Sequence, residues 1–460
     1  MMTQEELELI KNDAINGNEW AQCKLALCYE KGDGVEEDID KAIYWYTNAA
    51  EQNNAVAKLR LGMIYLSDEM DEDWEKGIAW LTQSAEQGFV LAMYRLGLEY
   101  YYRGQTEEKF DEQAAFWLSK AANLGHAKSQ RWLGQCYLNG RGVEKDEKQA
   151  VHWYTQSAEQ GYADAQFLLS LCYERGLGVE KDMEKAVAWN MKAAEQGLAD
   201  AQFVLGVRYD EGEVLPHDME QAIYWYTQAA EQEFPEAQKN LALYYSNVDD
   251  YEQAVYWFAK AAEQDHPVAQ CALGHCYADG AGVEQDYEQA IYWFTQAAEQ
   301  GDAEAQFALG FCYANGEGVE RNYEQAVYWY TKAAEQDNLD ALYNLGKCYE
   351  RGEGVEQDYD KAAALMTKVA EQGDSDAQCC LGDYYANGTG VPQDMSKALQ
   401  LYHLSEEQGN EYAQFNLGEC YEQGKGVKQD LSQATHWYTL SAEQGYEDAI
   451  EALERLEGNN

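Results

Sequence analysis

The sequence of 460 residues is poor in positive charge: 33 Lys and Arg stand against 83 Asp and Glu, for a formal net charge of −50. Binding to a nucleic-acid backbone requires clustered Lys and Arg that displace counterions, so the charge argues against such partners, and it argues equally against anionic membranes. The same charge favours solubility and attracts basic proteins by electrostatic steering. We therefore expect a protein or peptide partner, a basic one in particular. The alternative is that the acidic surface only keeps a monomer soluble.

Long apolar runs and linker sequences are also missing. No stretch approaches the roughly 18 apolar residues that span a bilayer. The N-terminal sequence MMTQEELELIKND lacks the basic region, apolar core and cleavage site of a signal peptide. Only four prolines are present, so no Pro-rich linker divides the chain. These features predict a cytoplasmic protein, with export that needs no cleaved signal left open.

Catalytic and metal-binding motifs are absent from the sequence. It contains no Ser-x-x-Lys, Gly-x-Ser-x-Gly or His-Glu-x-x-His motif. Cys271, His275 and Cys276 can lie near one face of a predicted helix, but zinc normally takes four ligands. We therefore expect no enzyme activity, no cofactor and no metal.

The dominant feature that is present is an internal repeat. A tryptophan recurs every 36 residues, with one shorter step of 32. The regular series is Trp117, Trp153, Trp189 and Trp225, followed by Trp257, Trp293 and Trp329. Such a period is typical of stacked supersecondary units in which each unit contacts its neighbours.

One copy, residues 163–197, shows why each unit is predicted to be a pair of helices. Its apolar stripes are Ala163, Gln166, Leu169, Ser170 and Tyr173 in the first half, and Ala186, Trp189, Ala193 and Ala194 in the second. Spacings of three and four residues indicate helices. Gly176 can end the first helix in a left-handed conformation, and Asp182 can cap the second. In the copy that begins its second helix after Asp286, Gln289 is expected to complete a capping box.

These residues resemble the Sel1-like repeat family, a relative of the tetratricopeptide repeats. The shared pattern is A-x-A-Q-x-x-L-G-x-x-Y-x-x-G-x-G-V-x-x-D-x-x-x-A-x-x-W-Y-x-x-A-A-E-Q-G. The resemblance covers residues 19–445 as about twelve copies, and repeats two, three and seven are irregular. It implies an all-α, right-handed α/α superhelical solenoid of helix-turn-helix repeats. Residues 1–18 and 446–460 are expected to form capping helices.

The resemblance also implies a function. Sel1-like proteins are usually adaptors or scaffolds, which predicts that a peptide or protein binds on the concave face. An alternative is a secreted or host-directed bacterial effector of the same fold. A third reading, a β-lactam-binding hydrolase, rests on cysteine-rich members with paired cysteines in each repeat.

The cysteines of this chain follow a different pattern. Seven of the eleven cysteines occupy a single repeat position: Cys28, Cys136, Cys172, Cys276, Cys312, Cys348 and Cys420. One cysteine per repeat leaves no disulfide partner within the unit, so we expect free thiols in a reducing compartment.

By analogy with tetratricopeptide stacks, the first helices should line the concave face. With the repeat leucine counted as position seven, positions five and nine hold the candidate partner-binding residues. These are Tyr94, Phe167, Leu171, Phe203, Val207, His275, Phe307, Phe311, Tyr343, Lys347 and Phe415. A ladder of apolar and aromatic residues suits a peptide with hydrophobic anchors. The alternative is that position five is ordinary core, because aromatic residues at helical spacing usually are. At position nine, Lys347, Asp383 and Glu419 vary where the framework does not.

Overall fold

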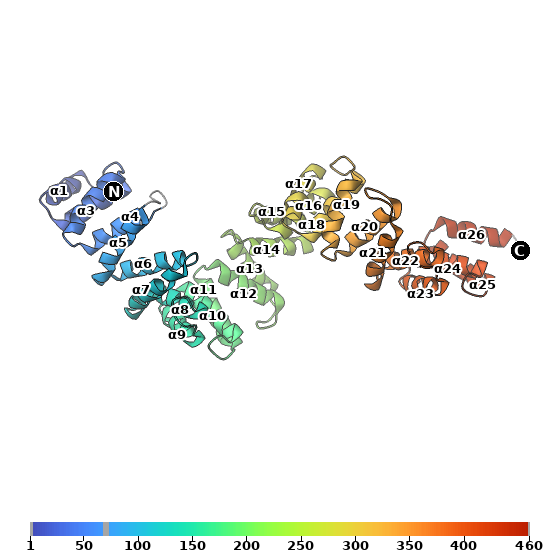
Figure 1. The fold of residues 1–460 in the computed structure, drawn as a ribbon, viewed down its shortest axis with the longest axis horizontal. Helices are drawn as coiled ribbons and strands as arrows, with labels where there is room; N and C mark the ends of the chain where they lie inside the picture. The colour runs from blue at the N-terminus through green and yellow to red at the C-terminus, as the bar shows by residue number, and fades with distance from the viewer. Residues whose placement is uncertain (1–2, 68–72, 459–460) are drawn as a thin grey trace. The chain divides into compact units, whose positions relative to one another are not determined.

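The computed structural model describes residues 3–67 and 73–458, and the described residues form an all-α protein whose helices follow one another in pairs (Figure 1). The helices of repeats one to six and the helix before them are α1 (Gln4–Ile15), α2 (Glu19–Lys31), α3 (Ile39–Glu51), α4 (Ala55–Tyr65), α5 (Trp74–Glu86), α6 (Val90–Arg103), η2 (Glu108–Phe110), α7 (Asp111–Asn123), α8 (Ala127–Asn139), α9 (Glu147–Glu159), α10 (Ala163–Arg175), α11 (Met183–Glu195), α12 (Ala199–Glu211) and α13 (Met219–Ala230). Those that follow are α14 (Pro235–Asn247), α15 (Tyr251–Ala262), α16 (Pro267–Asp279), α17 (Tyr287–Glu299), α18 (Ala303–Asn315), α19 (Tyr323–Ala334), α20 (Leu339–Arg351), α21 (Tyr359–Glu371), α22 (Ser375–Asn387), α23 (Met395–Glu406), α24 (Glu411–Gln423), α25 (Leu431–Glu443) and α26 (Glu447–Gly458).

Each repeat contributes an even-numbered first helix and an odd-numbered second helix, from α2 and α3 to α24 and α25. Each helix packs mainly against the helices directly before and after it in the chain. Helix α1 packs against α2, and α26 packs against α25. This is the solenoid of helix pairs that the 36-residue period predicts. None of the helices in the described ranges combines the length and apolar content needed to cross a bilayer.

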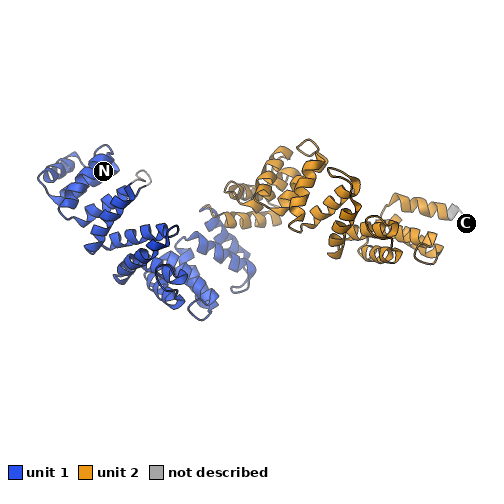
Figure 2. Cartoon of the chain, in the orientation of Figure 1, with its two compact units in different colours: residues 1–232 blue, residues 233–460 orange. Residues whose placement is uncertain are grey.

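The chain divides into two compact units, residues 1–232 and residues 233–460 (Figure 2). Unit 1 contains α1 to α13, and unit 2 contains α14 to α26. The border falls between the sixth and seventh repeats, so each unit is built from whole helix pairs.

Glycines and side-chain caps end the helices where the sequence predicts. Gly176 follows α10 with a φ of +71°, a left-handed conformation that glycine adopts without strain. Asp182 caps α11, since its carboxylate accepts a hydrogen bond from the Lys185 N–H at 3.0 Å. The predicted capping box at Asp286 is wrong in one half. The Asp286 carboxylate caps α17, but its backbone N–H already donates to the Tyr277 carbonyl at 2.9 Å and is not free for the Gln289 side chain.

A glycine at position eight lets the two helices of a repeat approach closely. In repeat nine, Gly310 lies against the ring of Tyr330, which is 2% exposed. In repeat five both residues of this contact are replaced. Ser170 stands in place of the glycine, and Asn190 stands in place of the aromatic ring. The Asn190 amide donates to the Ala201 carbonyl at 3.0 Å instead of filling space. The two positions therefore form one packing unit.

A buried glutamine at position four joins consecutive repeats. Gln166 on α10 donates from Nε2 to the Ala158 carbonyl at 3.2 Å, at the end of the preceding α9. Its Oε1 accepts from Nε2 of Gln196 at 2.7 Å, at the end of its own repeat. The same glutamine–glutamine bond links Gln52 to Gln22, Gln160 to Gln130, Gln232 to Gln202, Gln264 to Gln238, Gln300 to Gln270, Gln336 to Gln306, Gln408 to Gln378 and Gln444 to Gln414.

Repeats three and seven differ from the regular repeats in the connection between their helices. In repeat three the connection contains the 3₁₀-helix η2, and Phe110 at its end stacks on Tyr100 with ring centroids 5.7 Å apart. In repeat seven α14 ends at Asn247 and α15 begins at Tyr251. The connection of repeat two includes residues 68–72, which lie outside the described ranges.

The position-eight contact predicts unequal effects of two Gly→Ala substitutions. In Gly310→Ala the new Cβ meets the Tyr330 ring at 2.7 Å, and a ring cannot yield locally. In Gly346→Ala the nearest atom is the mobile end of Met366, at 2.9 Å. Overpacking costs roughly 1–3 kcal/mol, while alanine gains about 1 kcal/mol of helix propensity. We expect Gly310→Ala to lower the urea midpoint and Gly346→Ala to leave it unchanged or higher. Equal midpoints would show that the ring contact is not decisive.

Candidate functional site

All eleven predicted partner-binding residues lie on first helices. Tyr94 is buried, Phe311 is 42% exposed, and the other nine are half-buried. Some position-five rings contact the second-helix ring that packs against the position-eight glycine. The ring centroids of Phe307 and Tyr330 are 5.9 Å apart, and those of Phe415 and Tyr438 are 5.5 Å apart. One side of these rings therefore contributes to the core, and the other side borders the first-helix surface.

Three of the predicted residues line one cavity of about 530 Å³ in unit 2. They are Tyr343 and Lys347 on α20 and Phe415 on α24. The rest of the lining is Arg351 on α20, Asp376, Cys379, Cys380 and Asp383 on α22, Tyr412 and Asn416 on α24, and Tyr446 before α26. The other eight predicted residues lie outside this lining. The cavity thus spans the first helices of repeats ten, eleven and twelve.

The sequence analysis missed most of this lining, although a signal was present. Asp376, Cys379, Cys380 and Asp383 follow an i, i+3, i+4, i+7 spacing, which places them on one face of α22. At the position of Cys379 six other repeats have a phenylalanine or tyrosine, and at the position of Cys380 the residues range from alanine to tryptophan. The Cys379 thiol is smaller than these rings, which is consistent with the space beside it.

The basic residues of the cavity are paired with carboxylates of their own chain. Lys347 Nζ lies 2.6 Å from a Glu350 carboxylate oxygen. An Arg351 nitrogen lies 3.9 Å from Glu353. Asp376 and Asp383 have no Lys or Arg within ion-pair distance among the described residues. The remaining charge of the lining is therefore negative.

Asp383 is the most constrained of these carboxylates. Its Oδ1 accepts hydrogen bonds from the Tyr402 hydroxyl at 2.7 Å and from the Asn416 amide at 2.9 Å. Burial nevertheless raises the pKa of Asp383 above its ordinary value, because its charged form is poorly solvated. The Tyr402 hydrogen bond and the nearby Lys347 charge act in the opposite direction. The cavity floor therefore carries a carboxyl group that is costly to ionise.

The two thiols of the cavity are unreactive by their environment. Cys380 Sγ lies 3.8 Å from Lys347 Nζ and 4.0 Å from the Tyr343 hydroxyl. Burial raises the pKa of both Cys379 and Cys380, so both stay protonated at neutral pH. All eleven cysteines are free thiols. Across the residues that the structure describes, no cluster of three or more His, Cys, Asp or Glu side chains is arranged to hold a metal ion.

Aromatic rings form the outer wall of the cavity. The Tyr446 ring meets Tyr412 at a centroid distance of 5.1 Å and Phe415 at 5.2 Å, both edge to face. Tyr412 is 50% exposed, so its ring is available at the mouth. The Asp376 carboxylate in the same lining accepts a hydrogen bond from the Asn410 amide at 2.7 Å and has no cationic partner among the described residues. Ring faces next to such carboxylates make an arrangement that attracts cations.

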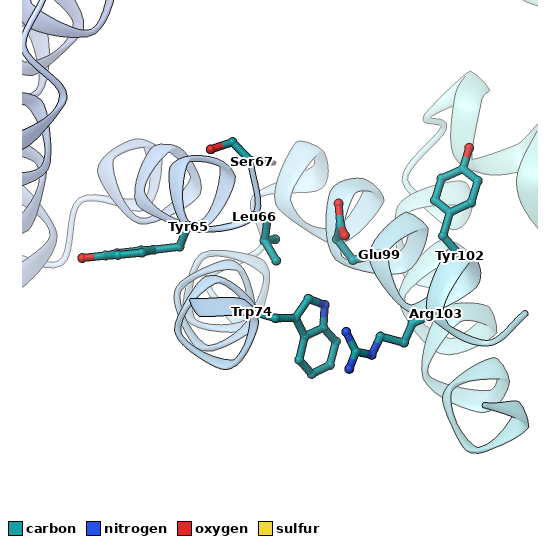
Figure 3. Close-up of a pocket in the computed structure, with 7 residues that line it drawn as sticks. All are labelled: Tyr65, Leu66, Ser67, Trp74, Glu99, Tyr102 and Arg103. Atoms are coloured by element: carbon teal, nitrogen blue, oxygen red, sulfur yellow. The ribbon is translucent and has the colours of Figure 1, made fainter. Parts of the chain in front are cut away.

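A second pocket, of about 270 Å³, lies in unit 1 between α4, α5 and α6 (Figure 3). The Arg103 guanidinium lies 4.5 Å from the Trp74 ring centroid, and the two side chains point toward each other. Burial raises the pKa of Glu99, which occupies the position of the repeated cysteine. Residues 68–72, which follow Ser67 at the pocket edge, lie outside the described ranges, and we assign no function to this pocket.

Comparison with known proteins identifies the repeat. The Sel1 repeat model matches twelve consecutive segments, at residues 21–54, 55–89, 90–126, 127–162, 163–198, 199–234, 235–266, 267–302, 303–338, 339–374, 375–410 and 411–446. These segments agree with the predicted array of about twelve copies. They also show that the short seventh copy is a full member of the series.

Two solved structures are similar over much of the chain. One is a protective antigen present in uropathogenic Escherichia coli strains, which displays an SLR fold. It is 33% identical with a TM-score of 0.76, and the alignment covers 99% of this chain and 91% of that one. The other, a Sel1 repeat protein from Oxalobacter formigenes, is 36% identical with a TM-score of 0.52, over 67% of this chain and 89% of that one.

A curated relative matches only locally. Chitin synthase regulatory factor 3 of Schizosaccharomyces pombe is 44% identical over 63 residues, which is 14% of this chain and 7% of that protein. The matched region therefore spans a small part of the relative's length.

The half-buried carboxyl of Asp383 predicts a pH-dependent gain of stability in Asp383→Asn. Both hydrogen bonds end on one oxygen, and an asparagine carbonyl can accept them. Because the folded pKa is raised, the wild type loses stability as pH rises above the ordinary Asp value of about 4. We expect the variant to have the higher urea midpoint at pH 7, and the difference to vanish below about pH 4. Asp376→Asn, at the rim, is the control. A variant less stable than wild type at pH 7 would contradict the prediction.

Proposed function

Because the chain belongs to the Sel1 repeat family, we propose that it is an interaction scaffold that binds a basic segment of a partner protein in the cavity of repeats ten to twelve. The observation that carries the proposal is the combination, in one cavity, of accessible aromatic ring surface with two carboxylates that have no Lys or Arg partner among the described residues. Asp376 and Asp383 supply the carboxylates, and Tyr412, Phe415 and Tyr446 supply the rings. The proposal assigns no catalytic step to the chain.

A lysine or arginine side chain of the partner fits this cavity by its chemistry. Its charge meets Asp376 at the rim, and its aliphatic stem lies along the ring faces of Tyr412 and Phe415. Cation–π contacts contribute about 0.5–1 kcal/mol at exposed sites and more where water is excluded. The chain's large negative charge adds long-range attraction for such a partner.

The proposal also includes the state in which the scaffold acts. We propose a monomer in the cytoplasm, where a reducing environment maintains eleven free thiols. The acidic surface supports a monomeric state because like charges oppose self-association.

A displayed library of random peptides tests the proposed specificity. We expect selected peptides to share a Lys or Arg next to an apolar residue and to bind more weakly as salt concentration rises. Asp376→Asn and Tyr412→Ala should each weaken a selected peptide about 10-fold, equivalent to about 1.4 kcal/mol. Tyr256→Ala, an equally exposed tyrosine on the second helix α15, is the matched control.

Two results would contradict the proposal. One is a selected peptide that is acidic, or whose binding is insensitive to salt. The other is equal affinity of the Asp376, Tyr412 and Tyr256 variants, provided that circular dichroism shows all three to be folded.

An alternative function outside the producing cell is favoured by one comparison. The similar protein from uropathogenic Escherichia coli strains is a protective antigen, and the similarity covers 99% of this chain. A scaffold that acts on host proteins outside the cell would also be accessible as an antigen. Fractionation of a producing culture separates the two roles: protein in the supernatant, without a cytoplasmic marker enzyme, supports the external role, and protein confined to the cell fraction supports the cytoplasmic one.

A further inference from the structure

Two adjacent repeats lack the tryptophan that the other ten repeats place on their second helix. The tryptophans are Trp45, Trp80, Trp117, Trp153, Trp189, Trp225, Trp257, Trp293, Trp329 and Trp437. Leu365 replaces the tryptophan in repeat ten, and Leu401 replaces it in repeat eleven. A leucine is much smaller than an indole, so each replacement removes volume from a packed contact.

The regular repeats show what the indole fills. Trp329 packs against a cluster that contains Ala298 and Leu309, with Tyr313 beside it. Trp293 packs in the same way, against the cluster of Ala262 and Leu273 and next to Tyr277. The indole thus occupies a space made by an alanine on the preceding second helix, and by a leucine and a tyrosine on the first helix of its own repeat.

The same space is open in repeat eleven. Two 36-residue steps after Ala298, Leu309 and Tyr313 stand Ala370, Leu381 and Tyr385. All three line a cavity of about 470 Å³, and Leu401 lines it with them. The cavity is therefore the indole space of a regular repeat, which Leu401 does not fill.

The chemistry of this space favours an aromatic ring. Its walls include Ala370, Leu381, Leu401 and Leu404, and Leu404 is 49% exposed at its mouth. In four regular repeats the indole Nε1 atom is buried without a hydrogen-bond partner among the described residues: Trp153, Trp225, Trp293 and Trp437. The space therefore accepts an indole for its shape and apolar area, without a polar contact to the ring.

We propose that this cavity receives the side chain of a tryptophan, or of a comparably large aromatic residue, from a partner protein. The ring takes the place that the chain's own tryptophan takes in ten other repeats. Glu371 and Gln400 at the rim offer acceptors for N–H groups of the partner's main chain beside the ring. An aromatic anchor in a preformed pocket is typical of the residues that dominate binding energy at interfaces.

This site is separate from the cavity that binds the basic segment. On α22, the indole cavity uses Gln378, Leu381 and Tyr385, whereas the other cavity uses Asp376, Cys379, Cys380 and Asp383. The two sets share no residue and lie on different faces of the same helix. A partner can therefore occupy either site without the other.

Repeat ten provides a matched control. Leu365 packs beside the cluster of Leu345, with Ala334 and Tyr349, which are the counterparts of the three wall residues. Leu365→Trp and Leu401→Trp thus make the same chemical change at the same repeat position. Only Leu401→Trp fills the cavity of repeat eleven.

The experiment uses N-acetyl-5-fluoro-L-tryptophanamide as the probe and ¹⁹F NMR of the full chain as the readout. We expect saturable binding to the wild type, at least about 10-fold weaker binding to Leu401→Trp, and binding to Leu365→Trp within about 2-fold of wild type. N-acetyl-leucinamide should compete poorly, because it leaves most of the space empty. Leu401→Trp should have a thermal midpoint no lower than that of wild type, since it restores the side chain of the regular repeat.

A second variant keeps the test decisive if Leu401→Trp misfolds. Leu404→Glu places a charge at the exposed mouth, where it does not disturb the core, and it should also weaken binding at least about 10-fold. Absence of saturable binding by the wild type would overturn the proposal. Wild-type affinity in folded Leu401→Trp or Leu404→Glu, or an equal loss in Leu365→Trp, would overturn it as well.

Discussion

A polar contact links most repeats of the array: the buried glutamine at position four, which nine of the twelve repeats carry. A buried amide without partners would cost about 1–3 kcal/mol, so it must find both a donor and an acceptor. Gln166, which is 5% exposed, finds its acceptor at Ala158 in the preceding repeat and its donor at Gln196 in its own. Each of these contacts therefore links one repeat to the one before it. Apolar packing surrounds the glutamine, and this packing joins the repeats in which Met93 or Leu342 takes the place of that residue.

The sequence predicts the fold well because its signals are local. The 3.6-residue stripes, Gly176 at a helix end and Asp182 at a cap each act within one turn. Twelve copies repeat the stripes, and nine of them repeat the glycine. The glutamine network was not predicted, although Glu-Gln ends eleven of the twelve repeats. Its two partners are 30 residues apart, and only the folded stack shows that they meet. The capping box at Asp286 failed for a related reason, since Tyr277 nine residues earlier takes the N–H.

The candidate site was predicted only in part, and physical reasons explain which part. Tyr343, Lys347 and Phe415 were found because position five or nine identifies the first-helix surface. The cavity itself required knowledge of the side-chain volumes at Cys379 and Cys380 in the packed state, which periodicity does not supply. The pairing of Lys347 with Glu350, which offsets the positive charge of this lining residue, is likewise visible only in the structure.

Three departures from the repeat pattern lie in repeats ten and eleven, and their positions argue for function. In repeat ten Leu342 replaces the position-four glutamine. Gln372, the counterpart of the glutamine that bonds to position four in other repeats, lines a cavity of about 410 Å³ together with Leu342. Leu401 replaces the tryptophan, and Asp383 places a costly carboxyl at position nine. Each change gives up packing or solvation that the regular repeats keep. A sequence that follows its local rules in the regular repeats is expected to break them where binding requires it. The three losses surround α22, which makes this helix the place where the scaffold departs furthest from a purely structural role.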